Sequence, residues 1–260
     1  SLTNSTWDDA SEKIMSMNGK RGHLNEAVME QILSSYSPHE REMRRYGRPS
    51  IGSGLVFPLG EEKVMVDPME IKSHWPRIAA IDFGWDHPTA VVWCAIDREE
   101  EMFYVYDCYR ASKASPSAHA QIIRNRPNFI PIAYPHDGNR RDSMGNPGLA
   151  DQYRNLGCNF LLEHFTNPPA LGSNKGSNSI EEGLMAMLQS VEADKFKVFS
   201  TLSDWFEEFR MYHRKDNKVV PLRDDLMSAT RYAFQSQRFA VAGEDPTWTE
   251  DVKYRNYGIV

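Results

Sequence analysis

The amino-acid sequence predicts an α/β fold in which a mixed central sheet is flanked by helices. Three β-type runs follow one another at residues 77–84, 89–97 and 101–110, and such a series favours an antiparallel meander. After the meander, helical and strand patterns alternate to about residue 240. This order of elements is compatible with a sheet of mixed strand direction that carries helices on its faces.

The chain divides by composition into three parts. Residues 1–76 contain two helical stretches, at 9–17 and 23–36, followed by a charged segment and by turns rich in glycine and proline, without strand alternation. We expect this part to be an appendage, or connector, to a folded domain at 77–240. The remaining residues, 241–260, are polar and are predicted to form a C-terminal tail.

Helix and strand signals alternate after the meander. A helical stretch near 117–125 precedes the apolar run FIPIAY at 129–134, which we expect to form a buried strand. After a polar loop, a short helix at 149–156 leads into the run NFLLE at 159–163, a further predicted strand.

The segment after the GSNKGSNS loop is predicted to be a helix. Ser179 and Glu182 have the spacing of a capping box. Its apolar face consists of Ile180, Leu184, Met187, Leu188 and Val191. The run KFKVFS at 195–200 then predicts a strand, WFEEFRMYH at 205–213 a helix, and residues 224–239 a final helix that begins with two aspartates.

Composition bounds the class of protein. Hydrophobic residues make up 40% and charged residues 25% of the chain, which is ordinary for a folded globular protein. The formal net charge of -6 argues against a generic DNA-coating protein, which would carry a basic surface.

Cys94, Cys108 and Cys158 are widely spaced, so they favour buried structural thiols over a disulfide framework or a zinc site. Apolar runs fall far short of the ~20 residues of a membrane helix, and no signal peptide is evident, so we expect a cytoplasmic protein with no membrane partner.

Two aspartates lie where predicted strands end. Asp82 closes the run RIAAID and is followed by Phe83 and Gly84, and Asp137 follows FIPIAY within the sequence PHDG. A carboxylate at a strand end is well placed to bind a metal ion. Aspartate also favours turns through its own backbone hydrogen bonds, so a turn-forming role is the alternative for each residue.

Asp224 and Asp225 precede the apolar positions of the final helix and therefore lie at its predicted N-terminus. The helix dipole favours carboxylates there, and N-capping is the alternative role for one of the two. Three separated acidic segments, each at the end of an element, can converge on one edge of the sheet. Phosphodiester hydrolysis uses such carboxylates to bridge two hard cations about 3.5–4 Å apart.

Basic and imidazole side chains near the acids are candidates for phosphate binding. Arg140 and Arg141 closely follow the second acid, and Lys175 lies in a Gly/Ser/Asn-rich loop before a helix, where free N–H groups favour phosphate. A solvated basic loop is the alternative for each of these three. His87 and His136 adjoin two of the acids, but an isolated histidine is more often a hydrogen-bonded bystander.

Three motifs in order, IDFGWDHPTA, YPHDG and RDDLMSATRYAF, resemble the acidic motifs of the C-terminal nuclease domain of tailed-phage terminase large subunits. The preceding segment, SYSPHEREMRRYGRPSIGSGLVFPLGEE, resembles the connector between the ATPase motor and the nuclease in that family. The resemblance covers residues 25–240 and is greatest to headful-packaging phages.

The resemblance implies a ribonuclease H-like fold with two Mg²⁺ or Mn²⁺ ions, bound by Asp82, Asp137 and a third acid, with Asp82 bridging both ions. The final motif departs from the family pattern, because many members have Asp-Ala where this chain has Ser228 and Ala229. The third acid must then be Asp225 or Asp224, and we favour Asp225.

The resemblance further implies a metal-dependent endonuclease that makes double-strand cuts in concatemeric DNA at the start of genome packaging and when the head is full. The implied partners are double-stranded DNA, the terminase small subunit, the portal protein and an ATPase domain. No GxxxxGK[ST] motif occurs in the sequence, and the chain starts at Ser1 without a methionine, so we expect that ATPase domain in a longer protein of which this is a fragment. The implied location is the cytoplasm of the bacterial host and not the mature virion.

Three other functions stay open on sequence alone. An actin-like nucleotide-binding fold also begins with strand-Asp-x-Gly, but it needs a later glycine-rich phosphate turn, for which YPHDGN is a poor substitute. A non-catalytic module that docks on the portal or procapsid would use the acids as turn formers and helix caps and would bind no metal. A Holliday-junction resolvase is the third alternative and is closer to the predicted nuclease.

Overall fold

The structure is a computed structural model that describes residues 54–140, 147–169, 176–215 and 218–243. The chain divides into two units, which are Ser1–Pro58 with His213–Val220, and Leu59–Tyr212 with Pro221–Val260. In the first unit, the described residues form the short hairpin of β7 (Arg214–Lys215) and β8 (Lys218–Val219) and a bridge between Leu55 and His213. The helices predicted at 9–17 and 23–36 lie outside the described residues, and the domain boundaries at 76 and 240 stay predictions.

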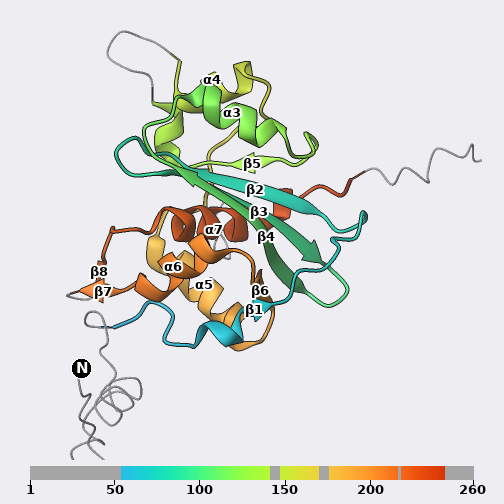
Figure 1. The fold of residues 1–260 in the computed structure, drawn as a ribbon, viewed down its shortest axis with the longest axis vertical. Helices are drawn as coiled ribbons and strands as arrows, with labels where there is room; N and C mark the ends of the chain where they lie inside the picture. The colour runs from blue at the N-terminus through green and yellow to red at the C-terminus, as the bar shows by residue number, and fades with distance from the viewer. Residues whose placement is uncertain (1–53, 141–146, 170–175, 216–217, 244–260) are drawn as a thin grey trace, which may run out of the picture. The chain divides into compact units, whose positions relative to one another are not determined.

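The second unit contains a six-stranded sheet in the order β1-β6-β4-β3-β2-β5 (Figure 1). Its strands are β1 (Met65–Val66), β2 (Arg77–Asp82), β3 (Thr89–Asp97), β4 (Met102–Ala111), β5 (Ile132–Ala133) and β6 (Phe196–Phe199). The strands β2, β3 and β4 form the predicted antiparallel meander. The pairs β1–β6, β4–β6 and β2–β5 are parallel, so the sheet is mixed as predicted.

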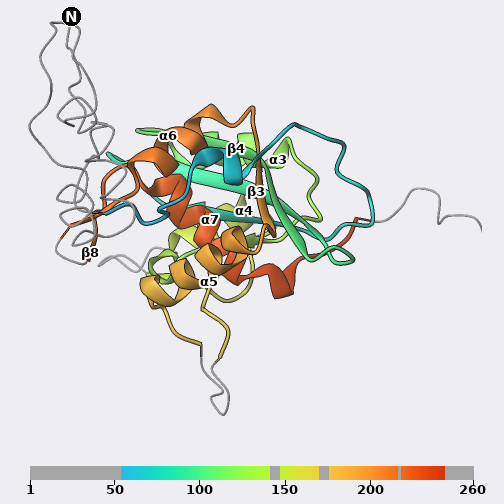
Figure 2. The ribbon, with the colours of Figure 1, turned by 90° about the horizontal axis from the view of Figure 1, so that it is seen from below.

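Helices cover both faces of this sheet (Figures 1 and 2). One face carries α3 (Pro116–Arg124) and α4 (Leu149–Asn155), and the other carries α5 (Ile180–Glu192), α6 (Ser203–Met211) and α7 (Asp225–Gln235). All nine residues of β3 are buried, which is expected of a central strand that is covered on both faces. Among the described residues, no helix is long and apolar enough to span a bilayer.

The alternation of side chains along β2 sets the direction of its last residue. Ala79 and Ile81 belong to the core under α3 and α4, which also contains Trp93. Because successive side chains on a strand point to opposite faces, Asp82 projects to the side of the sheet that α7 covers. A hydrogen bond from Tyr232 of α7 to Asp82 agrees with this direction.

Two strands predicted after the meander differ from the structure. Within 129–134, β5 has two residues, because the prolines at 131 and 135 that flank it cannot donate to a ladder. The strand predicted at 159–163 is wrong, since this segment makes one parallel bridge, between Phe160 and Ile132. The short β5 offers too little edge for a longer pairing, and Leu162 is 87% exposed.

Helix α5 begins as predicted but uses half of the capping box. The Ser179 hydroxyl accepts a hydrogen bond from the N–H of Glu182. The side chain of Glu182 accepts bonds from Ser177 and Asn167 and thereby joins the preceding loop to the helix. Ile180 is exposed, so the buried apolar positions of the helix are Leu184, Met187 and Val191.

The remaining boundaries shift by a few residues. Helix α6 begins two residues before the predicted 205–213, and α7 ends at Gln235, where a short 3-10 turn, η4 (Gln237–Phe239), follows. Strand β1 lies within the segment predicted as a connector and has no alternating pattern by which it could be recognised. The three cysteines are free, with Cys94 and Cys158 buried and Cys108 partly buried.

Candidate functional site

Asp82 ends β2 and is followed by a tight turn. In this turn the N–H of Gly84 donates to the Thr89 hydroxyl at 3.2 Å, and that hydroxyl donates to the Gly84 carbonyl at 2.8 Å. A Cβ atom on Gly84 would lie 2.4 Å from the carbonyl oxygen of His87, so the backbone can approach this closely only because residue 84 is glycine. The sequence Asp-Phe-Gly therefore forms a fixed turn directly after the carboxylate.

Asp137 lies in the 3-10 turn η3 (His136–Asn139), which follows β5. Because β5 runs parallel to β2, both strands end at the same edge of the sheet. Gly138 is buried in this turn and packs against two aromatic rings. A Cβ atom added to Gly138 would lie 2.7 Å from the Phe83 ring and 2.8 Å from the Tyr134 ring, so the turn fits only because this residue has no side chain. Asp137 itself is exposed.

Asp224 and Asp225 begin α7, as predicted. Asp224 occupies the N-cap position, but its side chain makes no cap hydrogen bond. Instead Glu208 of α6 accepts the N–H of Leu226 at 2.7 Å and, more weakly, that of Met227 at 3.4 Å. The capping role that was the alternative for one aspartate is thus filled by a glutamate from another helix.

The charges of the three acidic segments interact at Asp82. Burial, as the largest cause, and nearby carboxylates together raise the pKa of Asp82 to about 8. These carboxylates are, in decreasing order of effect, Asp225, Asp224 and Asp137. The hydroxyl of Tyr232, which donates to Asp82 Oδ1 at 3.3 Å, acts in the opposite direction. The structure therefore brings the four predicted acids into one electrostatically coupled group.

The two aspartates of α7 are also destabilised as anions. Burial raises the pKa of Asp225, which is 9% exposed, and the charge of His87 opposes this rise. Burial and the charge of Asp225 raise the pKa of Asp224 to about 6. His87 is exposed on the turn after β2, so it lies close enough to both aspartates to influence their charge.

The donor set has the chemistry of a site for a hard cation. Carboxylate oxygens are the protein ligands that Mg²⁺ and Mn²⁺ prefer. Among the described residues, none of the ion pairs involves Asp82, Asp137, Asp224 or Asp225. The charges of Arg231 and Arg110 oppose the rise in pKa of Asp224 and of Asp225, respectively, but burial outweighs them. As they stand, the described residues contain no three acidic, histidine or cysteine side chains close enough to enclose an ion. The acids are gathered, but they do not form a closed cluster.

An aromatic cavity adjoins the acids on the side of Asp137. Its volume is about 310 Å³, and Phe83, Trp85, Tyr153 and Asp137 are among the residues that line it. Trp85 is 60% exposed, although its carbonyl is fixed by a hydrogen bond from the N–H of Lys113. The sequence offered one signal for this residue, an aromatic side chain within a polar turn three residues after Asp82.

The predicted basic residues are only partly within the described chain. Arg140 is exposed directly after η3, and its N–H donates to the carbonyl of Asp137 at 2.9 Å. Arg141 and Lys175 lie outside the described residues. His136 is exposed, and its ring lies 6.4 Å from that of His164, measured between centroids.

Sequence reasoning missed Glu208. Its side chain has no exposed surface, and it lies on α6 three residues after the buried Trp205. An acid three residues after an aromatic residue on the apolar side of a predicted helix is the signal that could have identified it.

Comparisons with known proteins agree with this architecture. Residues 79–237 match the family model described as Terminase RNaseH-like domain. The terminase large subunits of Salmonella phage P22 and Enterobacteria phage LP7 are each 37% identical to this chain, over 219 and 213 residues. These alignments cover 84% and 82% of this chain but 43% and 44% of the relatives, so the chain spans less than half the length of these proteins.

Solved structures give the same result. The P22 large terminase nuclease domain is 36% identical, with a TM-score of 0.66 over 74% of this chain and 96% of that one. A large terminase from a thermophilic bacteriophage is 12% identical, with a TM-score of 0.55 over 86% of this chain and 55% of that one, and supports the fold alone. The resemblance and the ribonuclease H-like fold predicted from sequence are therefore confirmed, in place of the actin-like alternative. The chain belongs to the terminase RNase H-like domain family.

Proposed function

We propose that this chain is the metal-dependent endonuclease domain of a viral DNA-packaging terminase, which cuts concatemeric double-stranded DNA when packaging begins and ends. The observation that carries the proposal is the coupling of Asp82 to three other aspartates in a member of this family. The P22 relative, which is 36% identical over nearly its whole length, is itself described as a nuclease domain.

The proposed cofactor is a pair of Mg²⁺ or Mn²⁺ ions held by Asp82, Asp137 and Asp225, with Asp224 as the alternative third ligand. Asp82 would suit a bridging position, because the charges of all three other carboxylates raise its pKa. Bound divalent cations would lower the pKa of a coordinated water and stabilise the charge that develops on the leaving oxygen. They would also neutralise the repulsion that raises the pKa of Asp82.

The remaining residues of the site orient these ligands. The hydroxyl of Tyr232 donates to Asp82, and burial together with the Asp82 charge raises the pKa of Tyr232, so this hydroxyl stays protonated. The Gly84 turn fixes the backbone that follows Asp82. With cations bound, these residues would hold the ligands in an arrangement that suits in-line attack of water on the phosphodiester.

We propose that the DNA backbone lies along the exposed side of this group. Arg140, with Arg141 and Lys175, would contact phosphates without reading sequence. Trp85 is available to stack on a base or to pack on a sugar, as exposed aromatics do in other nucleic-acid sites. Such contacts favour cutting that is largely independent of sequence.

The biological setting follows from the family and is part of the proposal. An ATPase domain of the same full-length protein would move the DNA, and the terminase small subunit and portal protein would select and receive it. The chain would act in the cytoplasm of the bacterial host. The proposal includes no membrane partner.

The proposal is tested by plasmid cleavage with Mn²⁺, Mg²⁺ or EDTA. We expect the wild type to cut with either metal and not with EDTA, and Asp82→Ala, Asp137→Ala and Asp225→Ala to lose cutting. Asp67→Ala, which removes an exposed aspartate after β1, should cut like the wild type. Circular dichroism checks that each variant is folded.

Two results would contradict the proposal. Cutting that persists in the three variants would mean that other residues perform the chemistry. A folded wild type that cuts with neither metal would favour the non-catalytic docking module.

A further inference from the structure

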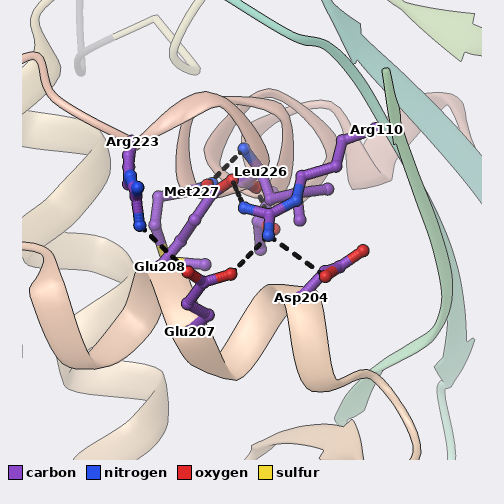
Figure 3. Close-up of polar contacts among 8 residues, drawn as sticks. Arg110, Asp204, Glu207, Glu208, Arg223, Leu226 and Met227 are labelled. Carbon is purple, nitrogen blue, oxygen red and sulfur yellow. Dashed lines mark hydrogen bonds and ion pairs between the residues drawn. The ribbon is translucent and has the colours of Figure 1, made fainter. Parts of the chain in front are cut away.

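Both carboxylate oxygens of Glu208 are engaged, and they point in different directions (Figure 3). Oε1 accepts a hydrogen bond from Arg110 Nη1 at 3.0 Å, and Oε2 accepts the N–H groups of Leu226 and Met227. One side chain of α6 therefore connects the end of β4 to the first turn of α7. That first turn begins with Asp224 and Asp225.

Burial raises the pKa of Glu208 to about 7, and the hydrogen bonds from the N–H of Leu226 and from Arg110 oppose this rise. An ionised carboxylate without exposed surface is strongly disfavoured unless a cation and hydrogen bonds compensate it. Arg110 Nη2 also contacts Asp204, at 3.1 Å, and Glu207. These two acids are 55% and 40% exposed, so solvent screens their pairs and the buried pair with Glu208 matters most.

A helix N-terminus attracts nearby acceptors, because its first N–H groups have no partner within the helix. At α7 the side chains nearest in sequence are Asp224 and Asp225, and aspartate is a favoured N-cap residue. An aspartate oxygen that capped the helix would be directed at the backbone and away from a cation. Glu208 fills this role in their place, since Asp224 makes no side-chain cap bond.

We propose that Glu208, held by Arg110, is a positioning residue for the acidic site. It caps α7 from outside the helix and so fills a role that would otherwise direct the Asp224 carboxylate at the N–H groups of the first turn. This inference rests on the proposed metal-dependent function of the acids. Glu208 touches no reacting group, and it acts through the helix that carries them.

The chemistry of the side chain suggests the variant to test. A carboxylate offers an acceptor on each oxygen, whereas an amide offers one acceptor and one donor. In Glu208→Gln, the amide can accept from Arg110 or from Leu226, and its NH₂ group then faces a donor on the other side. The substitution keeps the size of the side chain and removes one of its two connections.

The matched control is Asp204→Asn. Asp204 lies on the same helix and pairs with the same arginine, but it is exposed and makes no hydrogen bond to α7 among the described residues. Arg110→Lys is the second test variant, because it keeps the positive charge and loses the guanidinium geometry. It covers the case in which Glu208→Gln does not fold.

The measurements are Mn²⁺ binding by calorimetry, Mn²⁺-dependent plasmid cleavage, and amide hydrogen exchange of Leu226 and Met227, all on the full chain. We expect Glu208→Gln to bind Mn²⁺ about 10- to 100-fold more weakly, as is typical when a residue that orients metal ligands is removed. Exchange at Leu226 should accelerate by at least a similar factor. Arg110→Lys should change in the same direction by a smaller factor, and Asp204→Asn should match the wild type.

A purely structural role would lower the melting temperature of Glu208→Gln and leave the Mn²⁺ dissociation constant of the folded protein unchanged. That result, with a wild type that binds Mn²⁺ and cuts DNA, would overturn the positioning role alone. If the folded wild type neither binds Mn²⁺ nor cuts, the proposed function fails first, and the positioning role fails with it. The two failures are thus told apart by the wild-type measurement.

Discussion

The two acidic segments beside Asp82 are held in place by different interactions. Asp137 is exposed in a short 3-10 turn, and apolar packing of Gly138 against two aromatic rings sets its position. Asp225 is 9% exposed, and the helix that carries it is capped by the buried Glu208. The carboxylate on the α7 side is therefore buried and costly to ionise, whereas the one on the Asp137 side is solvated. We infer that the Asp137 segment changes conformation more readily than the α7 segment when a ligand approaches from solvent.

The largest expected effect compares Asp137→Asn with Asp225→Asn. Both should lose metal-dependent cleavage on the order of a thousandfold, because each removes several kcal/mol of charge stabilisation at the scissile phosphate. Their melting temperatures in EDTA should differ. Asp225→Asn should melt higher than the wild type, because it removes a buried anion whose pKa is raised, and exposed Asp137→Asn should melt within about 1 °C.

This comparison would be contradicted if Asp225→Asn lost cleavage activity and also melted below the wild type in EDTA. Asp225 would then be a structural cap and not a ligand held at a cost. Asp67→Ala, the exposed aspartate used above, controls for loss of one negative charge.

The second expected effect is a pH dependence centred on Asp82. Its pKa is about 8 in the folded, metal-free protein and near 3.8 when unfolded, so the folded state holds an extra proton between these values. The free energy of unfolding in EDTA should therefore decrease as the pH rises through this window, with the stabilisation fully present below the unfolded value. Mn²⁺ must displace the same proton, so its affinity should increase by up to about tenfold per pH unit below pH 8.

Calorimetry in two buffers of different ionisation enthalpy would measure this proton release. Asp82→Asn should release no proton at this site. A wild-type affinity that stays constant from pH 6 to 8 would show that Asp82 does not exchange a proton for the metal ion.

The third effect tests how the Asp137 side is held. Gly138→Ala places a Cβ atom against Phe83 and Tyr134, and such overpacking should lower the free energy of unfolding by about 1–3 kcal/mol. Asn139→Ala, one residue further, loses a hydrogen bond from the Tyr134 hydroxyl and should cost about 1 kcal/mol. Urea unfolding measures both, and a smaller loss for Gly138→Ala than for Asn139→Ala would contradict a turn that is held by packing.

The smallest effect concerns Trp85. If this exposed side chain stacks on DNA, Trp85→Ala should weaken DNA binding without metal by about 1 kcal/mol, roughly fivefold, and should change stability little. Met185→Ala on α5, with 57% exposure, is the matched control for loss of an exposed apolar side chain. Fluorescence anisotropy measures the binding, and equal affinities for both variants would remove Trp85 from the DNA surface.

The parts of the fold that were predicted are those with strong local patterns. The strands β2, β3 and β4 are apolar and follow one another, so both their existence and their meander could be predicted. Strand β1 has two residues, and it exists because β6 offers it an edge. The short β5 and the single bridge at Phe160 likewise depend on partners that are distant in sequence.

The candidate site shows the same division. Asp82 and Asp137 could be found because each follows an apolar run that ends in a turn. Glu208 could not be assigned a partner, because its acceptors serve backbone N–H groups 18 and 19 residues later on another helix. Pairings of this kind are decided by how α6 and α7 pack, and helical periodicity in the sequence does not specify that packing.

The most direct test is thermal melting of the wild type and Asp82→Asn, each with EDTA and with Mn²⁺, at pH 7.5. The central claim is that Asp82 is kept in an unfavourable place because a cation binds there. We expect Asp82→Asn to melt above the wild type in EDTA, and Mn²⁺ to raise the melting temperature of the wild type and leave that of the variant unchanged. A variant that melts below the wild type in EDTA, or gains as much from Mn²⁺ as the wild type does, would contradict this claim.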